Sequence, residues 1–165
     1  MSSSHLLPSD SILAPFLAPF KKMGVVVAGH GSREPAAILE FREQVRLFSE
    51  LQTGIMEAGF LEFETPGIGE AIDRAITRGA NKVVVLPAML TAAHHVKTDI
   101  PDIIRIAQQK NPLIPILYGR HFDLHPKIIA LCKMRVQQAL LDWTSVNAAQ
   151  ILLMVVGRGS SDSTG

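Results

Sequence analysis

Hydrophobic residues along the chain alternate between two spacings, and this alternation predicts strands and helices in turn. Short apolar runs rich in Val and Ile are typical of strands buried on both faces of a parallel sheet. Between these runs, apolar residues recur every three or four positions among charged ones, as in amphipathic helices. The predicted strands are residues 23–28, 60–63, 82–86, 114–118 and 151–156, and the predicted helices are 35–58, 67–78, 99–110 and 126–143. This order predicts an α/β fold: an open, mostly parallel sheet of four to five strands with helices on both faces, in flavodoxin-like layers.

The chain divides into three parts. Residues 1–22 contain the apolar stretch 11–20, which Pro15 and Pro19 interrupt and two lysines follow. A secretory signal carries its positive charge in front of the apolar region, so we expect a poorly ordered extension and a cytoplasmic protein. A removed targeting segment is the alternative. Residues 23–145 form the α/β domain, and we expect 146–165 to be the truncated start of a second homologous unit.

An internal repeat is the basis for that third part. Residues 23–34 (MGVVVAGHGSRE) and 152–162 (LLMVVGRGSSD) both run from an apolar strand into Gly-X-Gly-Ser and a polar pair that ends in an acid. His30 and Arg158 occupy equivalent positions. Apolar strands followed by glycine turns are common in α/β proteins, which is the other explanation of the match. We interpret it as true repetition.

Composition narrows the class of protein. The length of 165 residues is about that of one domain, and 47% hydrophobic against 19% charged residues argues against a disordered, collagen-like or coiled-coil chain. Sixteen Lys and Arg against fifteen Asp and Glu leave no basic excess for nucleic acid, and charges recur too often for a membrane span. The single cysteine, Cys132, excludes an internal disulfide and a cysteine-rich metal site. Cys132 lies on the apolar stripe of helix 126–143, so we expect it in the core.

Residues that can handle a metal ion follow three of the predicted strands. His30 follows the first strand, Glu62 lies at the end of the second, and His94 and His95 follow the third. Ligands of open parallel sheets bind outside the carboxyl ends of the strands, and neighbouring strands lie about 4.8 Å apart. Imidazole and carboxylate groups suit a first-row divalent metal, and histidine accepts protons near neutral pH. A lone histidine after a strand is more often a capping residue, and a glutamate near a strand end is usually solvated. The glycines that flank His30 in an exposed turn favour a function for it, and we expect at least one of His94 and His95 to be functional.

Motifs for nucleotides and phosphate esters are incomplete. The Gly29-X-Gly31 turn lacks the third glycine of a dinucleotide fingerprint, because Glu34 occupies that position, and no P-loop is present. A histidine phosphatase would have Arg where Gly29 stands. Ser32 lacks the strained elbow of a hydrolase nucleophile.

The segments 29–33 (GHGSR), 60–62 (FLE) and 86–101 (LPAMLTAAHHVKTDIP) together carry a family resemblance. Their order and spacing resemble the sirohydrochlorin chelatases (class II tetrapyrrole chelatases), and the string HVKTDIP at 95–101 is the most specific part. Residues 118–120 (YGR) and 125–126 (HP) are similar to a later family segment, so the likeness covers about residues 23–142. The sequence GRGSSD at 157–162 is similar to the opening of the second half of long-form cobaltochelatases. The chain is therefore most like the N-terminal half of such a protein.

The resemblance implies a lyase that inserts a divalent metal into sirohydrochlorin and releases two protons, in cobalamin or siroheme-type tetrapyrrole biosynthesis. It implies no organic cofactor, and the metal is a substrate: Co²⁺ is favoured, and Fe²⁺ and Ni²⁺ stay open. His30 and His95 take the family's histidine positions and Glu62 its acidic position, as metal ligands and proton acceptors. The residues leave open which histidine mainly holds metal and which mainly removes protons.

The substrate carries several carboxylates, so cations near the sheet edge are candidates for binding it. Arg33, Lys97 and Arg120 are these cations, and the alternative for each is a solvated surface charge. The hydroxyl of Ser32 and the amides around Gly31 can hydrogen-bond a carboxylate.

Three positions depart from the family pattern. His94 stands where the family often has Gly, so it is either a further metal ligand or an exposed neighbour. Thr65 stands where many relatives have a second acid, and Arg158 replaces the histidine of the second half.

A half-size chelatase domain leaves one side of its cleft open, and the family closes it by pairing two domains. We therefore expect a homodimer or pairing with a second homologous half, and no nucleic-acid or membrane partner. Two other functions stay open. One is a non-catalytic half-domain that binds metal or tetrapyrrole, and the other is a phosphate-binding or phosphatase α/β domain.

Overall fold

The computed structural model describes residues 22–51, 54–90, 95–141, 147 and 151–156. Its elements are β1 (Met23–Gly29), α2 (Pro35–Glu50), β2 (Ile55–Phe60), α3 (Ile68–Thr77), β3 (Lys82–Pro87), the π-helix η2 (His95–Asp99), α4 (Ile100–Lys110), β4 (Ile116–Tyr118) and α5 (Pro126–Leu140). The N-terminal extension predicted at residues 1–22 lies outside the described residues apart from Lys22.

The strands form one parallel sheet in the order β2-β1-β3-β4. The predicted α/β class and open parallel sheet are confirmed. β1 lies at the centre, between β2 and β3, which explains its continuous apolar run. The register pairs Gly29 with Phe60 and Ala28 with Pro87, so the strands end together at their carboxyl edge.

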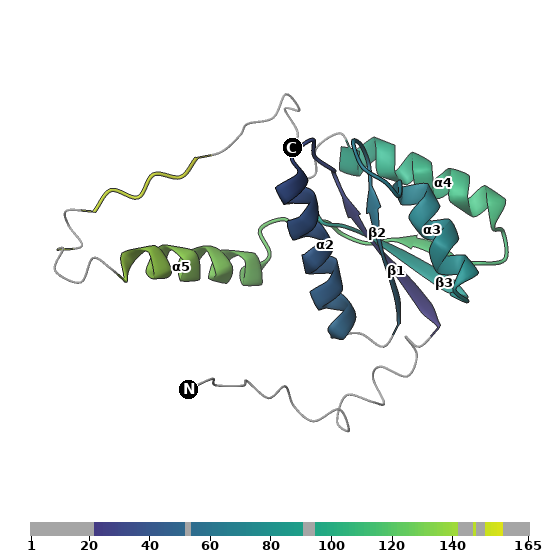
Figure 1. Ribbon diagram of the computed structural model, residues 1–165, viewed down its shortest axis with the longest axis horizontal. Helices are drawn as coiled ribbons and strands as arrows, with labels where there is room; N and C mark the ends of the chain where they lie inside the picture. The colour runs from purple at the N-terminus through teal and green to yellow at the C-terminus, as the bar shows by residue number, and fades with distance from the viewer. Residues whose placement is uncertain (1–21, 52–53, 91–94, 142–146, 148–150, 157–165) are drawn as a thin grey trace, which may run out of the picture.

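Helices cover both faces of the sheet, with α3 and α4 on one side and α2 on the other (Figure 1). Successive side chains of a strand point to opposite faces. Val26 and Ala28 of β1 therefore pack in the same cluster as Ile68 and Ile72 of α3. Val25 and Val27 form the second cluster, with Val45 of α2.

Two predicted boundaries are wrong. The helix predicted over 35–58 ends at Glu50, and residues 55–60 form β2 instead of a strand at 60–63. Gly59 lies inside β2. A Cβ there would come within 2.9 Å of the Cα of Ile68, so this glycine allows α3 to pack closely on the strand. Short apolar runs such as 55–60 fit a helix or a strand equally well by periodicity alone.

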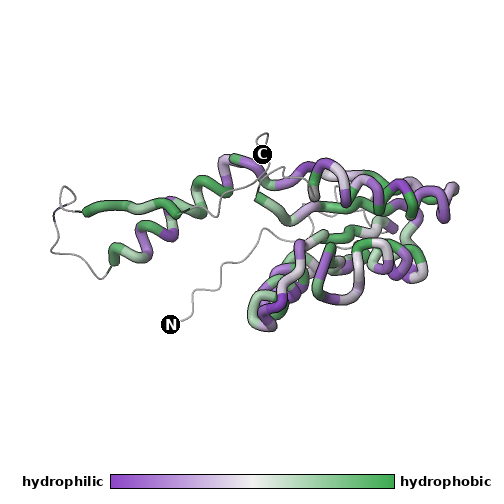
Figure 2. The backbone as a smooth tube through the Cα atoms, turned by 90° about the horizontal axis from the view of Figure 1, so that it is seen from above, coloured by the Kyte–Doolittle hydropathy of each residue, from purple (hydrophilic) through white to green (hydrophobic). Residues whose placement is uncertain are grey.

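Two expectations for the C-terminal part, a buried Cys132 and a strand at 151–156, are also wrong. Helix α5 has no buried residue, and Cys132 is exposed and not in the core. Residues 151–156 form no strand, and Leu152 to Val156 are 61–86% exposed. The physical reason is that α5 extends away from the sheet (Figure 1). The hydrophobic segment 151–156 lies away from the sheet, beside α5 (Figure 2), and residues 151–153 line a hollow with the end of that helix.

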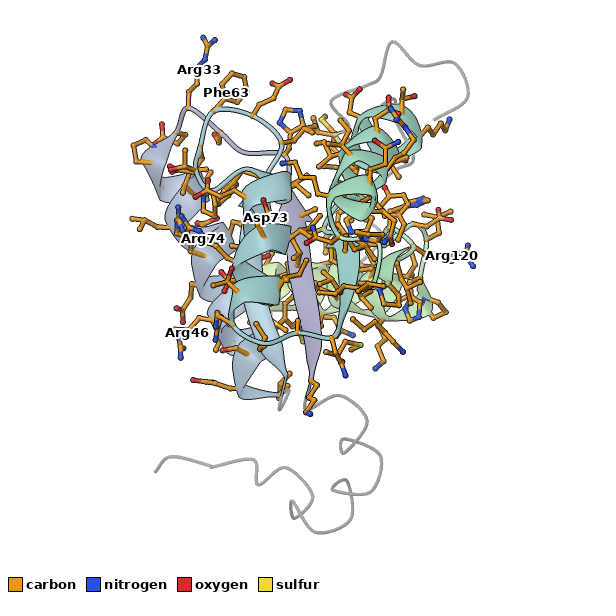
Figure 3. The ribbon with its side chains drawn as sticks, turned by 90° about the vertical axis from the view of Figure 1, so that its right-hand side faces the viewer. Arg33, Arg46, Phe63, Asp73, Arg74 and Arg120 are labelled. Carbon is orange, nitrogen blue, oxygen red and sulfur yellow. The ribbon has the colours of Figure 1, made fainter. Side chains whose placement is uncertain are left out.

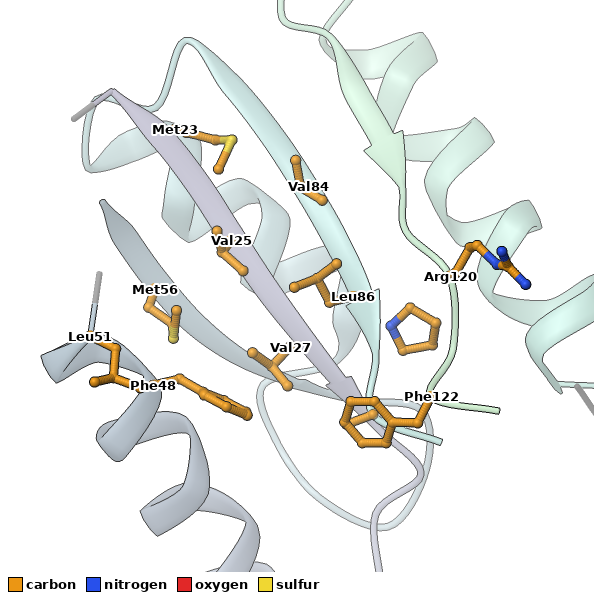
Figure 4. A pocket seen from close by; sticks show the side chains of 12 residues that line it. Met23, Val25, Val27, Phe48, Leu51, Met56, Val84, Leu86, Arg120 and Phe122 are labelled. Carbon is orange, nitrogen blue, oxygen red and sulfur yellow. The ribbon is translucent and has the colours of Figure 1, made fainter. Parts of the chain in front are cut away.

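The face of the sheet that α2 covers is left partly open. A hollow of about 600 Å³ lies beside α2 over the middle of the sheet (Figure 4). Its lining is almost wholly apolar: Met23, Val25, Val27, Phe48, Leu51, Met56, Val84, Leu86, Pro87, Ala88, Arg120 and Phe122. Among the described residues, no helix is both long and apolar enough to cross a membrane.

Candidate active site

Backbone pairing between β1 and β2 continues past the strand ends and places His30 beside Glu62. The amide of Leu61 donates to the carbonyl of Gly29 (3.0 Å), and the amide of Glu62 donates to the carbonyl of His30 (3.0 Å). Both side chains are exposed at the carboxyl edge of the sheet. The structure thus places the backbones of His30 and Glu62, which lie 32 residues apart in the sequence, side by side at this edge.

Gly31 is where the two loops at this edge come closest. Its φ is +90°, and a Cβ on it would lie 1.8 Å from the carbonyl oxygen of Glu62. Every other residue would carry that Cβ and separate the loops, and an L side chain would also be strained at this φ. Gly31 therefore has a structural role at the site as well as the predicted amide contact.

Ser32 and Arg33 complete the first loop. The Ser32 hydroxyl accepts a hydrogen bond from the amide of Glu34 (3.0 Å), which helps to position the loop before α2. Arg33 is exposed and its Cζ lies 4.9 Å from the ring centroid of Phe63. Phe63 in turn lies near His30, with 6.4 Å between their ring centroids.

The loop after β3 leads into η2. His94 and the side chain of His95 lie outside the described residues, although the backbone of His95 begins η2. The next residue, Val96, is buried, and its carbonyl accepts a hydrogen bond from the Tyr118 hydroxyl (2.8 Å). Burial raises the pKa of Tyr118, so its hydroxyl keeps the proton that it donates. Lys97 is exposed on η2.

Arg120 lies apart from Arg33 and the first loop. Figure 3 shows Arg33 and Phe63 together at one end of the sheet and Arg120 well away from both. Arg120 instead lines the apolar hollow beside α2 (Figure 4). Within the described ranges no three His, Cys, Asp or Glu side chains gather as a metal site, and the side chains of His94 and His95 fall outside those ranges.

The family model for CbiX matches residues 24–139, which include both loops and all four strands. The chain belongs to the CbiX family. It is 35% identical over 139 residues to a sirohydrochlorin cobaltochelatase of Priestia megaterium, a match that covers 84% of this chain and 45% of that protein. It is 31% identical over 143 residues to a sirohydrochlorin ferrochelatase of the same organism, covering 84% and 51%. The chain thus spans about half the length of these curated relatives.

Solved structures have the same fold. The sirohydrochlorin chelatase SirB from Bacillus subtilis subspecies spizizenii, in complex with cobalt, superposes with a TM-score of 0.68 at 28% identity. That match covers 71% of this chain and 50% of SirB. A CbiX protein from Marinobacter aquaeolei VT8 superposes with a TM-score of 0.64 at 19% identity, which supports the fold alone. It covers 72% of this chain and 97% of the Marinobacter protein.

Sequence reasoning missed two residues of this CbiX site. Phe63 follows Glu62 directly, and an aromatic residue between two glutamates was a signal that could have been used. Tyr118, on β4, holds the segment after His95 through the hydrogen bond from its hydroxyl to the carbonyl of Val96. No local signal indicates that contact, because it depends on how β4 lies beside β3.

Proposed function

We propose that this chain carries a site for inserting a divalent metal into sirohydrochlorin, with Co²⁺ as the favoured metal. The main support is the backbone hydrogen bond from Glu62 to His30, which holds a carboxylate and an imidazole on neighbouring loops at the carboxyl edge. The names of the two Priestia relatives, a cobaltochelatase and a ferrochelatase, are consistent with this chemistry.

The reaction exchanges two pyrrole N–H protons for one divalent metal ion. His30, His95 and Glu62 are the proposed groups that hold the incoming metal and accept these protons, with His94 as a further candidate ligand. A neutral imidazole binds a first-row metal and also accepts a proton, so one residue can serve both steps in turn. Few protein ligands and an open position favour release of the metal, whereas a closed four-ligand site would retain it. No organic cofactor is required.

The carboxylates of the macrocycle need donors near the metal. The amide of Gly31, the hydroxyl of Ser32 and the guanidinium of Arg33 lie next to His30 in the first loop and are the proposed nearest contacts. Lys97, on η2, would reach a carboxylate on the His95 side. Arg120, beside the apolar hollow, would serve a part of the substrate farther from His30.

We also propose that the chain self-associates by exchanging α5. The hollow beside α2 exposes apolar side chains, and burying them against another surface would stabilise the protein. Helix α5 exposes apolar side chains too: Ile129, Leu131 and Met134 are each 40–45% exposed. The connection before α5 is held to β3 and its following loop: the amide of Gly119 donates to Val85 (2.8 Å) and that of Phe122 to Met89 (2.9 Å). This connection directs α5 away from its own sheet (Figure 1), so α5 of a second copy is the proposed cover.

A cytoplasmic location belongs to the same proposal. Cys132 is an exposed free cysteine, and a free thiol persists best in a reducing compartment. Fractionation of cells that express the tagged chain tests this.

The macrocycle absorbance tests the proposed activity directly. The chain is mixed with sirohydrochlorin and Co²⁺, Fe²⁺ or Ni²⁺, and the rate is compared with a blank without protein. We expect acceleration that is greatest with Co²⁺, and a loss of about a hundredfold in His30→Ala and His95→Ala, the usual scale for removing a general base. His121→Ala, in the loop after β4, is the matched control and should keep the wild-type rate.

Other outcomes of the assay discriminate the remaining functions. Binding of sirohydrochlorin without acceleration would support a non-catalytic half-domain instead. Phosphate-ester turnover that survives His95→Ala would support the phosphatase interpretation. Normal rates in either histidine variant would remove that residue from the mechanism.

A further inference from the structure

Phe63 has a backbone conformation that a bulky residue rarely adopts. Its φ is +64°, in the left-handed region where a Cβ is crowded. The amide of Glu64 donates to the carbonyl of Glu62 (2.8 Å) and closes a three-residue turn around Phe63. Turns of this size with a positive central φ are rare and strained.

Contacts of the two residues after Phe63 hold this turn in place. Arg42 donates to the carbonyl of Thr65 (2.6 Å) and to the carboxylate of Glu64 (3.4 Å). The same Glu64 oxygen accepts the amide of Thr65 (2.8 Å). Strained residues persist where their surroundings fix them, and they concentrate at functional sites.

Burial does not explain the strain at Phe63. Its side chain is 53% exposed and belongs to neither core cluster. The ring lies instead among site residues: its centroid is 6.4 Å from that of His30 and 4.9 Å from Cζ of Arg33. The turn thus presents a flat apolar surface at the edge where the histidine lies (Figure 3).

The space beside His30 is too small to enclose a macrocycle. The cavity lined by His30, Gly31 and Ser32 has a volume of about 170 Å³. Pockets that enclose drug-sized ligands have volumes of about 300–1,000 Å³. Within the described residues, this part of the edge therefore offers a tetrapyrrole its outer surface, where a flat group can align it.

We propose that Phe63 is the substrate-positioning residue on whose ring one face of the tetrapyrrole lies, beside His30. Arg33, which contacts that ring in the structure, would then move to a carboxylate of the macrocycle. An exposed cation–π contact is weak compared with a charge-assisted hydrogen bond, so the exchange is favourable. This inference rests on the proposed function and names the group that orients its substrate.

The variant Phe63→Gly separates positioning from folding. Glycine adopts φ near +64° without strain, so folding stability should stay the same or rise. Affinity for metal-free sirohydrochlorin, measured by absorbance titration, should fall about tenfold, the scale found when an aromatic stacking surface is removed. KM for sirohydrochlorin should rise with it, while KM for Co²⁺ stays the same. Phe63→Tyr keeps the ring and should restore the wild-type affinity.

Asp123→Gly is the matched control, because Asp123 also has a positive φ (51°) but lies in the loop before α5. It should leave sirohydrochlorin affinity unchanged. Wild-type affinity in Phe63→Gly, with chelation intact, would overturn this inference and leave the proposed function standing. A wild-type chain that neither binds sirohydrochlorin nor inserts metal would overturn the proposed function itself.

Discussion

At the scale of single residues, Gly31 allows the closest contact in the site and its substitution has a clear expected effect. Gly31 and Gly79 both have positive φ (+90° and +97°), but a Cβ on Gly79 would meet nothing within 4 Å. Alanine at either position should cost about 1–2 kcal/mol in folding stability through backbone strain, and Gly31→Ala should cost more because its Cβ also meets the carbonyl oxygen of Glu62. Only Gly31→Ala should also push Glu62 away from His30 and slow metal insertion, by about a hundredfold for a shift near 1 Å.

Thermal unfolding and the chelation assay on the two glycine variants check this expectation. Equal chelation rates in Gly31→Ala and Gly79→Ala would show that the spacing between the two loops is unimportant. A control assay at saturating Co²⁺ separates slower insertion from weaker metal binding.

The position of candidate residues at one sheet edge was predictable wherever topology alone decides it. His30 and Glu62 follow neighbouring parallel strands, and ligands of open parallel sheets bind at that edge, so their common location could be expected while their roles stay predictions. The close contact at Gly31 and the turn at Phe63 depend on φ values and on a neighbouring loop. Neither leaves a periodic signal in the sequence, because each depends on a contact between separate segments.

At the scale of elements, the hydrogen bond from Tyr118 to Val96 ties β4 to the start of η2. Tyr118→Phe removes one hydrogen bond to a buried carbonyl, so we expect a loss of about 1 kcal/mol in folding stability. Because that segment carries His95, the same variant should also slow metal insertion. Urea unfolding and the chelation assay measure the two effects.

The contribution of Tyr118 to folding stability depends on pH in a direction that can be predicted. Burial raises the pKa of Tyr118 in the folded state above its unfolded value, about 10. The folded protein then binds the proton more tightly, so this contribution to stability is full below pH of about 10 and is lost as pH rises through the folded pKa. Tyr118 is the only tyrosine, so the absorbance of its phenolate reports this titration alone. An equal phenol pKa in folded and urea-unfolded protein would contradict the expectation.

Elements were predicted best where burial is greatest. The continuous apolar run of β1 and the four-residue spacing of Ile68, Ile72 and Ile76 in α3 correspond closely to the observed bounds. The boundary between α2 and β2 was misplaced because Ile55 fits both the helical spacing and a short strand. Only the sheet partners of β2 decide between them, and those lie elsewhere in the sequence.

At the scale of the whole molecule, two apolar surfaces stay uncovered within the described residues: the hollow beside α2 and the sides of α5. The sequence correctly predicts the helix α5, but the expectation that Cys132 is buried assumed that the helix returns to its own sheet. Amphipathicity predicts that a helix needs a partner surface and does not say which chain supplies it. Large exposed apolar patches mark interaction sites, so the exchange of α5 accounts for both surfaces together.

Cross-linking between chains tests this exchange, because Cys132 on α5 is the only native thiol. Wild-type chain is refolded together with a tagged Leu86→Cys, Cys132→Ser variant, whose single thiol lies in the hollow. A short thiol-specific cross-linker should then join wild type to the tagged chain, because exchanged α5 brings Cys132 of one copy over the hollow of the other.

A tagged Asp73→Cys, Cys132→Ser variant is the control and should give no mixed product, because Asp73 lies on the opposite face, on the exposed side of α3. If Leu86→Cys with Cys132 retained gives only a link within one chain, and sedimentation gives a monomer, α5 covers its own sheet and the exchange is wrong.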